Sequence, residues 1–457
     1  MLDIFLTTKD AAATPIWLVR SSELKHWCVE HAGAGAQWVE TSGFKADAGK
    51  VLLLPDGSGG LTGVLLGIGD GADPFITGAL ASALPLRTYR FAGKLGASAD
   101  NAVLGFAFGT YQFTFYTGRA REHPRLILPD GVDGAELSRI ATAIFLARDL
   151  INTPANDMSP ADLADAAFNV ARAHGAVASV IVGNDLLTQN YPMVHAVGRA
   201  AEVAPRLIDF TWGRADAPKV TLVGKGVCFD TGGLDLKPSS AMLLMKKDMG
   251  GAANVLALAD LIMGANLNLR LRVLIPAVEN NVAGNSFRPG DVLKSRKGWS
   301  VEIGNTDAEG RLILADALAE ADSEAPDLVI DMATLTGAAR TALGPDLPPF
   351  YTHDDALAAD IADAAQLQSD PVWRMPLWKP YDNWLDSKIA DVNHVSDGAF
   401  AGSITAALFL ARFIEKSKAW VHFDIYGWMP KPKPGRPVGG EAQAVRALYH
   451  ILKERYS

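Results

Sequence analysis

The sequence is poor in cysteine and has no long apolar run. Its 457 residues include two cysteines, Cys28 and Cys228, which excludes a disulfide framework and a zinc cluster held by thiolates. Apolar stretches stay well below the ~20 residues that span a bilayer, and the longest candidate, 406–414, is interrupted by Arg412. The first residues lack a basic run and carry an early Asp3, so no secretory or transit signal is expected. These absences predict a cytoplasmic protein that has no membrane partner.

Basic residues are also outnumbered. The chain has 42 Lys and Arg against 51 Asp and Glu, which gives a formal net charge of −9. This balance argues against a protein that works by neutralising the phosphates of nucleic acids. Hydrophobic residues make up 49% of the chain and charged residues 20%, so a large packed core is expected and disorder is not.

Short apolar runs alternate with helical patterns along the chain. In the N-terminal part, runs bounded by glycine, proline and aspartate are typical of buried strands, at 16–19, 51–54 and 63–68. A periodic apolar pattern predicts a helix over 134–151, and Ser159-Pro160 has the residues that begin the next one. Further strands are predicted at 220–223, 270–275, 328–330 and 420–425, and further helices at 252–263, 311–321 and 403–414.

This alternation predicts an α/β fold in two parts. Strands separated by helices form a mostly parallel or mixed sheet whose faces are covered by helices. We expect a smaller N-terminal α/β domain over residues 1–130, a linking helix over 131–151, and a larger C-terminal α/β domain over 152–457. Ligands of such folds bind beyond the carboxyl ends of the strands.

Lysines and acidic residues gather among glycines in three segments, 224–238, 245–251 and 305–312. Taken singly, the acids have structural explanations. Asp248 before Gly-Gly is a candidate helix cap, and Asp307 and Glu309 favour a helix N-terminus through its dipole. These explanations leave open why lysines and acids recur beside glycines, which let backbones approach one another closely.

A divalent metal site accounts for the three segments together. Carboxylates that meet at strand ends repel one another unless cations neutralise them. Oxygen-rich sites suit Mg²⁺ and Mn²⁺ and accept zinc when the geometry allows. The sequence has no His-Glu-x-x-His motif, and none of its nine histidines lies in the three segments, so histidine ligands are not expected.

The segment Asn305–Leu312 resembles the signature of the leucyl (cytosol) aminopeptidase family, a group of two-metal peptidases. Segments 224–238 and 248–251 resemble further motifs in the family's order, as do 152–157 and 331–339. The resemblance covers roughly the last 310 residues. It implies a dinuclear metal aminopeptidase, which removes the N-terminal residue of a peptide by a metal-activated water and whose C-terminal domain is catalytic.

The resemblance also implies the metal ligands. Asp230 and Glu309 would bridge two divalent ions. Asp248 and the amine of Lys225 would complete the tighter site, and Asp307 would complete the exchangeable one. A lysine can be a ligand only after it loses its proton, because an ammonium group has no lone pair. Mn²⁺ and Zn²⁺ are the ions expected first, with Mg²⁺ and Co²⁺ as alternatives.

Two cationic side chains are implied to act in catalysis. Lys237 would polarise the scissile carbonyl and stabilise the oxyanion that follows. Arg311 would hold a small anion, bicarbonate in the family, which serves as the general base. The backbone amides implied to help hold this anion are those of Ala308, Gly310 and Leu335.

A substrate class follows from the same resemblance. A free α-amine can donate its lone pair to a metal and an acylated one cannot, so peptides with a free N-terminus are the expected substrates. The residues implied to bind them are Met245, Thr334, Leu335, Gly337, Tyr426 and Met429.

Three positions depart from the family pattern. Tyr426 stands where many relatives have a small residue, so its ring either reshapes the pocket or is buried and bonded elsewhere, which leaves the leucine preference open. Asp235 replaces a small residue and is expected to be solvated. The segment 434–442 differs from the usual form and is expected near the pocket rim.

Other functions on the same scaffold are weighed against the peptidase. Some family members are DNA-binding or regulatory proteins, but the net charge opposes this, and Arg119, Arg121 and Arg125 form the one candidate basic patch before residue 130. A Cys-Gly dipeptidase is a further alternative within enzymes. A binding module without chemistry is opposed by the presence of all the expected site residues. The resemblance implies a homohexamer.

Overall fold

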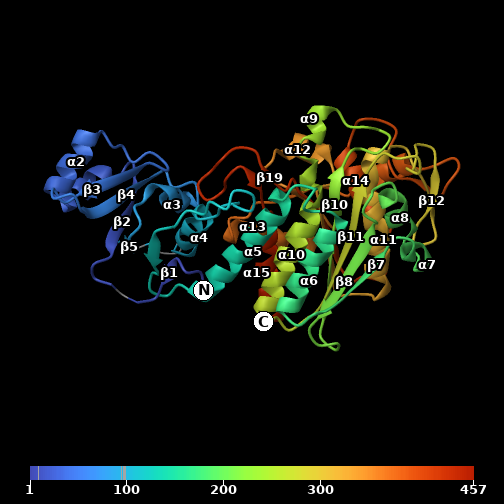
Figure 1. Ribbon diagram of the computed structural model, residues 1–457, viewed down its shortest axis with the longest axis horizontal. Coiled ribbons are helices and arrows are strands. Elements are labelled where there is room, and N and C mark those ends of the chain that lie inside the picture. The colour runs from blue at the N-terminus through green and yellow to red at the C-terminus, as the bar shows by residue number, and fades with distance from the viewer. Residues whose placement is uncertain (9, 94, 96–98) are drawn as a thin grey trace. The chain divides into compact units, whose positions relative to one another are not determined.

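The computed structural model describes residues 1–8, 10–93, 95 and 99–457, and its contacts divide the chain into two compact units. The smaller unit comprises Met1–Phe145 and Lys431–Val438, and the larger comprises Leu146–Pro430 and Gly439–Ser457 (Figure 1). The division falls inside helix α5 (Gly134–Asn152). The sequence predicted domain boundaries at residues 130 and 151. Those boundaries remain a prediction.

The smaller unit is built on a mixed sheet. The strands predicted at 16–19, 51–54 and 63–68 are present, and β4 runs between β2 and β3, parallel to β2 and antiparallel to β3. In sheet order the strands are β1 (Phe5–Leu6), β6 (Arg125–Ile127), β5 (Thr88–Ala92), β2 (Thr14–Arg20), β4 (Leu61–Gly69) and β3 (Val51–Pro55). Its helices are α1 (Leu24–Glu30), α2 (Ala34–Ser42), the 3₁₀ helix η1 (Ile76–Ala79), α3 (Leu80–Ala83) and α4 (Ala99–Gly109).

The larger unit contains the sheet that positions the candidate site. In sheet order its strands are β16 (Trp373–Arg374), β15 (Pro349–Tyr351), β18 (Trp420–Asp424), β14 (Leu328–Ala333), β9 (Lys219–Gly224), β11 (Arg270–Asn280), β8 (Arg206–Trp212) and β7 (Val177–Val182), and β10 (Gly226–Asp230) also pairs with β11. The central strands β18, β14, β9 and β11 are parallel. Strand β8 pairs antiparallel with β11 and β7, and β15 pairs antiparallel with β18 and parallel with β16. The predicted mixed α/β sheet is therefore confirmed.

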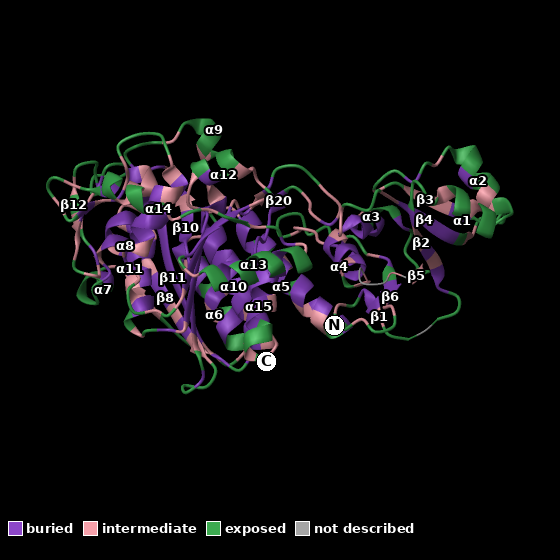
Figure 2. Cartoon of the chain, turned by 180° about the vertical axis from the view of Figure 1, so that it is seen from behind, coloured by how far each residue is buried: buried purple, intermediate pink, exposed green. Residues whose placement is uncertain are grey.

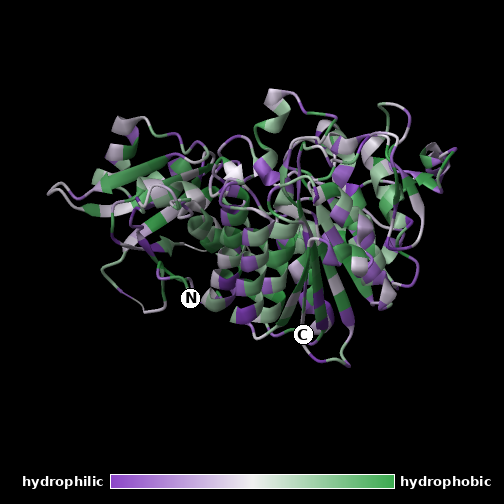
Figure 3. Ribbon diagram, turned by 45° about the vertical axis from the view of Figure 1, so that its right-hand side comes forward, coloured by the Kyte–Doolittle hydropathy of each residue, from purple (hydrophilic) through white to green (hydrophobic). Residues whose placement is uncertain are grey.

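Helices cover both faces of this sheet, as its apolar strands require. All six residues of β14 are buried, and the strands of the larger unit are mainly green on the hydropathy scale of Figure 3. One face is packed by α6 (Pro160–Ala173), α10 (Gly250–Gly264) and α15 (Val445–Tyr456), and the other by α8 (Pro192–Gly198), α11 (Glu309–Ser323) and α14 (Gly402–Ala411) (Figure 1). Helix α10 is apolar on all sides and buried almost throughout (Figure 2), which is typical of a helix enclosed by other elements.

The remaining elements of the larger unit are the helix α13 and several shorter helices and strands. They are α7 (Asp185–Thr188), α9 (Ser239–Met242), α12 (Gly337–Leu343), α13 (Asp355–Leu367), the 3₁₀ helices η3 (Met245–Met249), η4 (Thr306–Ala308) and η5 (Lys379–Leu385), and the strands β12 (Val292–Lys294), β13 (Ser300–Glu302), β17 (Val392–Asn393), β19 (Trp428–Met429) and β20 (Gly439–Gly440). Among the described residues, no helix combines the length and the apolar character needed to cross a membrane.

Candidate metal centre and adjoining cavity

The carboxyl ends of three neighbouring parallel strands lie at the same level of the sheet. In the register of β14, Met332 is opposite Gly224 at the end of β9, and Ala333 is opposite Asp424 at the end of β18. The residues that follow these strands therefore emerge side by side. They begin with Lys225 after β9, Thr334 after β14 and Ile425 after β18, and all three line one cavity.

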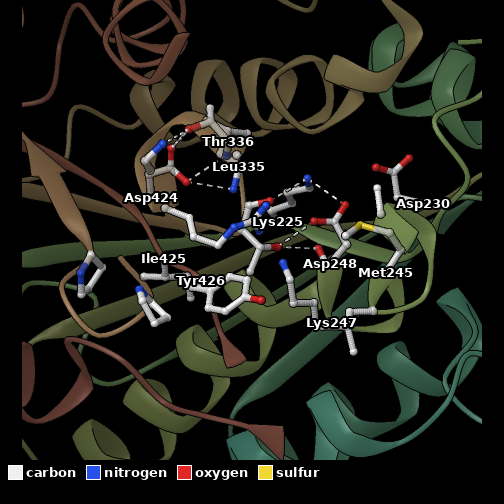
Figure 4. Close-up of a pocket in the computed structure, with 18 of the residues that line it drawn as sticks. Lys225, Asp230, Met245, Lys247, Asp248, Leu335, Thr336, Asp424, Ile425 and Tyr426 are labelled. Atoms are coloured by element: carbon white, nitrogen blue, oxygen red, sulfur yellow. Dashed lines mark hydrogen bonds and ion pairs between the residues drawn. The ribbon is translucent and has the colours of Figure 1, made fainter. Parts of the chain in front are cut away.

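Lys225 lies at the centre of the candidate site. Its side chain is buried, and its ammonium group lies 2.8 Å from Oδ2 of Asp248 and 2.9 Å from Oε1 of Glu309 (Figure 4). It also donates a hydrogen bond of 3.1 Å to the carbonyl of Thr334. Burial alone would lower the pKa of Lys225, but Asp248 and Glu309 outweigh it and raise that pKa above its ordinary value.

The glycine of the third segment lets Lys225 reach this position. A Cβ atom at Gly310 would lie 2.6 Å from both Cε and Nζ of Lys225, which is closer than such atoms approach one another. The side chain of Lys225 thus crosses the first turn of α11 directly over its backbone, and a larger residue at 310 would push the amine away.

Asp230 ends β10 and is fixed from several directions. Its Oδ1 accepts hydrogen bonds from the Gly232 amide at 2.9 Å and from the side-chain amide of Asn280, at the end of β11, at 2.8 Å. Its Oδ2 lies 2.7 Å from the ammonium group of Lys237, which also pairs with Asp307. Burial opposes the charge of Lys237, but Asp230 and Glu309 raise its pKa above the ordinary value.

The loop that carries Lys237 is tied to the segment that carries Asp307. Oδ2 of Asp235 accepts the amide of Thr306 at 2.7 Å and the hydroxyl of Thr306 at 3.1 Å, and that hydroxyl accepts the Asp235 amide at 2.9 Å. Asp235 is exposed, yet it is not merely solvated as expected from the sequence. Its carboxylate fixes the two loops against each other.

Asp248 lies in η3, just before the two glycines that open α10. Its Oδ1 accepts the hydroxyl of Thr334 at 2.9 Å. A Cβ at Gly251 would lie 2.1 Å from the carbonyl oxygen of Met332, so the glycine allows α10 to begin against the end of β14. Burial raises the pKa of the Asp248 carboxyl above its usual value.

Three carboxylates converge at this point. Asp230, Asp307 in η4 and Glu309 at the start of α11 each offer an oxygen atom, and these atoms lie within 4.8 Å of one another. Burial, and after it the charge of Asp230, raises the pKa of Asp307 to about 6 and that of Glu309 well above its usual value. The cause is the cost of holding several negative charges together away from water.

The residues present fit divalent cations. Oδ2 of Asp248, Oδ1 of Asp307 and Oε1 of Glu309 are buried and accept no hydrogen bond of normal geometry from the described residues; each contacts a lysine ammonium group instead. Buried carboxylate oxygens of this kind are the donors that hard divalent ions prefer. The set has oxygen atoms and one lysine nitrogen, and no histidine of the described residues joins it.

Arg311 lies in the first turn of α11 and is buried. Its Nη1 donates 2.9 Å to the carbonyl of His394, while its Nε has no hydrogen-bond partner among the described residues. Burial lowers the pKa of Arg311 to about 10. Two of the amides expected to assist it donate elsewhere in this structure: Ala308 to the carbonyl of Asn305 at 3.2 Å, and Leu335 to Asp424 at 3.0 Å.

A cavity of about 460 Å³ adjoins the carboxylates. Among the residues predicted to bind substrate, Met245, Leu335 and Tyr426 line it (Figure 4). Thr334 and Gly337 also line it, but the Thr334 hydroxyl is engaged by Asp248. Met429, in β19, is buried and is not among the lining residues.

Tyr426 is one of the residues that line this cavity, and its effect on the preferred first residue stays a prediction. The Lys247 ammonium lies 5.0 Å from the centre of the Tyr426 ring, and the Arg340 guanidinium lies 4.9 Å from it. The ring is therefore part of the cavity wall and contacts two cations. Burial lowers the pKa of Lys247 to about 8.

Sequence patterns missed three residues of this site. Asp424, at the end of β18, accepts the amides of Leu335 and Thr336 (Figure 4), and its only signal was an acid at the end of an apolar run. Lys247 is next to the predicted ligand Asp248, and Arg340 lies in α12. Lys247 stands in the segment 245–251 and Arg340 directly follows the segment 331–339, but no role was expected for either, because only the folded chain brings them to Tyr426.

Comparisons with known proteins cover the whole chain. The catalytic-domain model of the cytosol aminopeptidase family matches residues 145–449, and the model of the M17 aminopeptidase N-terminal domain matches residues 14–129. A probable cytosol aminopeptidase from Chlorobium phaeobacteroides is 37% identical over 456 residues, with 90% of each chain covered. A peptidase B from Pectobacterium carotovorum is 43% identical over 330 residues, which span 70% of this chain and 76% of that protein.

Solved structures are similar over the same range. The cytosol aminopeptidase from Coxiella burnetii superposes with a TM-score of 0.96 at 47% identity, with 100% of both chains covered. The bottromycin maturation enzyme BotP, solved in complex with Mn, superposes with a TM-score of 0.86 at 33% identity, with 97% of this chain and 100% of that chain covered.

Proposed function

The chain belongs to the cytosol aminopeptidase family and is a metal-dependent aminopeptidase, and from this membership we propose how its own residues carry out the reaction. Lys225, Asp230, Asp248, Asp307 and Glu309 hold two divalent ions, and the adjoining cavity receives the N-terminal residue of a peptide. The observation that carries this proposal is the convergence of three carboxylates within 4.8 Å beside two lysines and an open cavity.

The ligands divide between two positions. Asp230 and Glu309 would be shared by both ions. Asp248 and the Lys225 nitrogen would complete the site of one ion, and Asp307 would complete the site of the other. Two bound divalent ions supply a Lewis acid for the peptide carbonyl and a water of lowered pKa. Mn²⁺ is supported by the structural relative solved with Mn, and Zn²⁺, Mg²⁺ and Co²⁺ suit the same donors.

Lys237 acts on the substrate rather than on the metals. Its ammonium group lies 2.7 Å from Oδ2 of Asp230, and the bond between Asp235 and Thr306 fixes its loop. A charged donor held in place at the edge of the cavity stabilises the oxyanion that forms when the carbonyl is attacked.

Arg311 holds a small anion, bicarbonate by family resemblance, which takes up and returns the proton of the reaction. The unpaired Nε of Arg311 supports this role, and the Gly310 amide at the start of α11 is placed to assist it. Ala308 and Leu335 assist only if their amides leave their present acceptors.

The substrate is a peptide with a free N-terminus. Asp230, Asp248, Asp307 and the buried Lys225 make part of the cavity lining polar, whereas Met245 and the Tyr426 ring give apolar surface for the first side chain. We propose a cytoplasmic location, supported by the names of the relatives, and a homohexamer, supported by family resemblance; sedimentation of the purified protein measures the latter. The comparisons favour neither DNA binding nor a Cys-Gly dipeptidase.

Chelation tests the proposal directly. Protein stripped of metal should not hydrolyse leucine p-nitroanilide, and addition of Mn²⁺, Zn²⁺ or Co²⁺ should restore hydrolysis with two ions bound per chain by elemental analysis. N-acetyl-leucine p-nitroanilide should not be cleaved by the restored enzyme. Full activity of metal-free protein, or equal cleavage of the acetylated substrate, would refute it. Gel shifts at low salt should show no DNA binding, and Cys-Gly should be cleaved no faster than Leu-Gly.

A further inference from the structure

Two cations flank Tyr426 in the cavity without an anionic partner among the described residues. The Lys247 ammonium lies 5.0 Å and the Arg340 guanidinium 4.9 Å from the centre of the Tyr426 ring, and all three residues line the cavity. In Figure 4 the ammonium end of Lys247 is directed toward Tyr426 and Asp248. Among the described residues neither cation forms a close ion pair, although the charges of Asp248 and Asp424 act on Lys247.

Lys247 is held in the wall of the cavity. Its side chain is 4% exposed, and its contact with the Tyr426 ring is a cation–π interaction rather than an ion pair. Keeping a cation away from water is costly unless an anion compensates it. The Lys247 ammonium can therefore pair with an anionic group that enters the cavity.

The nearby carboxylates are already engaged. Asp248 pairs with Lys225 and accepts the hydroxyl of Thr334. Asp424 accepts the amides of Leu335 and Thr336 and the hydroxyl of Thr336. Neither forms an ion pair with Lys247 or Arg340 among the described residues, so a carboxylate of the substrate can still pair with these cations.

Arg340 provides the second positive charge from another element. It lies in the last turn of α12 and is exposed, so it can approach a bound group without a large cost in desolvation. Beyond it the wall is formed by three prolines, Pro345, Pro348 and Pro349. Tyr426 occupies the space that a small residue would leave open, which limits the room for a long branched side chain.

We propose that this part of the cavity binds the side-chain carboxylate of an N-terminal glutamate or aspartate, so that the enzyme prefers peptides with an acidic first residue. The proposal rests on the proposed aminopeptidase function and names its substrate class. The Lys247 ammonium and the Arg340 guanidinium bind the carboxylate as charge-assisted donors, and the Tyr426 ring contacts the methylene groups. A neutral side chain leaves both cations without compensation, which disfavours it.

A carboxylate could also be the C-terminus of a dipeptide. Aminoacyl p-nitroanilides separate the two sources because they have no C-terminal carboxylate. We expect kcat/KM for glutamate p-nitroanilide to exceed that for glutamine p-nitroanilide by ~10- to 100-fold. A preference that appears only with Leu-Gly over its C-terminal amide would overturn the proposal, because the cations would then bind the C-terminus.

Variants test the two cations. Lys247→Met and Arg340→Gln should each lower the ratio of kcat/KM for glutamate over glutamine p-nitroanilide by ~10-fold. Arg340 is exposed, so its variant stays informative if Lys247→Met does not fold. The matched control is Lys246→Met: Lys246 donates to the carbonyl of Asn152 and does not line the cavity, so the ratio should stay within about twofold of the wild type. A ratio that Lys247→Met and Arg340→Gln leave unchanged contradicts the proposal.

Binding of the products gives a readout besides turnover. L-glutamate should bind more tightly than L-glutamine by calorimetry, by the same ~10-fold, and Arg340→Gln should remove the difference. If leucine p-nitroanilide is cleaved and glutamate is not preferred, this inference fails and the aminopeptidase stands. If no aminoacyl substrate is cleaved by the metal-loaded enzyme, the proposed function itself fails.

Discussion

Asp424 anchors the backbone of Leu335: its Oδ1 accepts the Leu335 amide at 3.0 Å. The same oxygen accepts the Thr336 amide at 3.0 Å, and Oδ2 accepts the hydroxyls of Thr336 at 2.6 Å and of Ser403 at 3.1 Å. A carboxylate at the end of β18 thus fixes the turn that leads from β14 into α12. This turn forms one wall of the cavity.

Replacing Asp424 with Ala should release that turn. Two amides and two hydroxyls lose their acceptor, so we expect the free energy of unfolding to fall by about 1–3 kcal/mol and kcat/KM to fall by ~10- to 100-fold as the cavity wall loses its position. Urea unfolding and hydrolysis of a p-nitroanilide measure the two effects. Ser403→Ala is the control, because it removes one contact to Oδ2 and keeps the amide bonds. If Asp424→Ala keeps the wild-type kcat/KM, the turn holds its position without the Asp424 carboxylate.

Substitution of Lys237 should lower kcat, whereas substitution of Lys225 should lower the metal content. Lys237→Met should lower kcat by ~10²–10³, the effect of losing one oxyanion donor, while the metal content stays at the wild-type level. Lys225→Met should lower the metal content, since it removes a ligand. Elemental analysis beside steady-state kinetics separates the roles. Loss of metal from the Lys237 variant would reverse this assignment.

His394 should make stability depend on pH. It is fully buried, with Nε2 2.8 Å from the carbonyl oxygen of Asn305, and burial, with the nearby Arg311, lowers its pKa to about 3. Between about 6.5 and 3 the unfolded chain binds a proton that the native chain does not. This group therefore lowers the unfolding free energy by about 1.4 kcal/mol for each pH unit below 6.5.

Urea unfolding at pH 7, 6 and 5 measures this dependence. His394→Gln should give a shallower decline than the wild type, whatever its stability at pH 7. His353→Gln, at an exposed position, should follow the wild-type curve. Parallel curves for His394→Gln and the wild type would mean that His394 is protonated in the native state.

Arg148 and Glu441 form a buried ion pair within the larger unit. The Arg148 Nη2 lies 3.0 Å from Oε2 of Glu441, and both side chains are less than 10% exposed. Glu441→Met should cost about 3–5 kcal/mol of unfolding free energy, because it leaves the arginine charge buried without its carboxylate. The double variant with Arg148→Met should regain most of that loss by thermal unfolding. If the double variant is no more stable than Glu441→Met, the lost unfolding free energy comes from packing rather than from the unpaired charge.

Much of the fold could be predicted because the buried strands are apolar on both faces. The runs at 220–223, 270–275, 328–330 and 420–425 correspond to β9, β11, β14 and β18, and Ser159 forms the predicted cap of α6. Strands of two residues such as β17 and β19 exist only through their partners, so no local pattern could indicate them. The grouping of Lys431–Val438 with the smaller unit depends on contacts with distant residues for the same reason.

Some residues of the candidate site could be predicted from the sequence and others could not. Its ligands lie in contiguous motifs, so the resemblance could name them before their geometry was known. Asp235 looked solvated because its partner, Thr306, is distant in the sequence. No role was expected for Lys247, Arg340 or Asp424, because their contacts with Tyr426 and Leu335 join segments that only the folded chain brings together.

The order β18–β14–β9–β11 has a consequence for the synthesis of the protein. The lysines and carboxylates come from separate stretches between Lys225 and Glu309, and they meet only after β9 has paired with β11 on one side and β14 on the other. A nascent chain that has not reached β14 has no assembled centre. Assembly of the metal centre thus depends on the pairing of the central strands of the sheet.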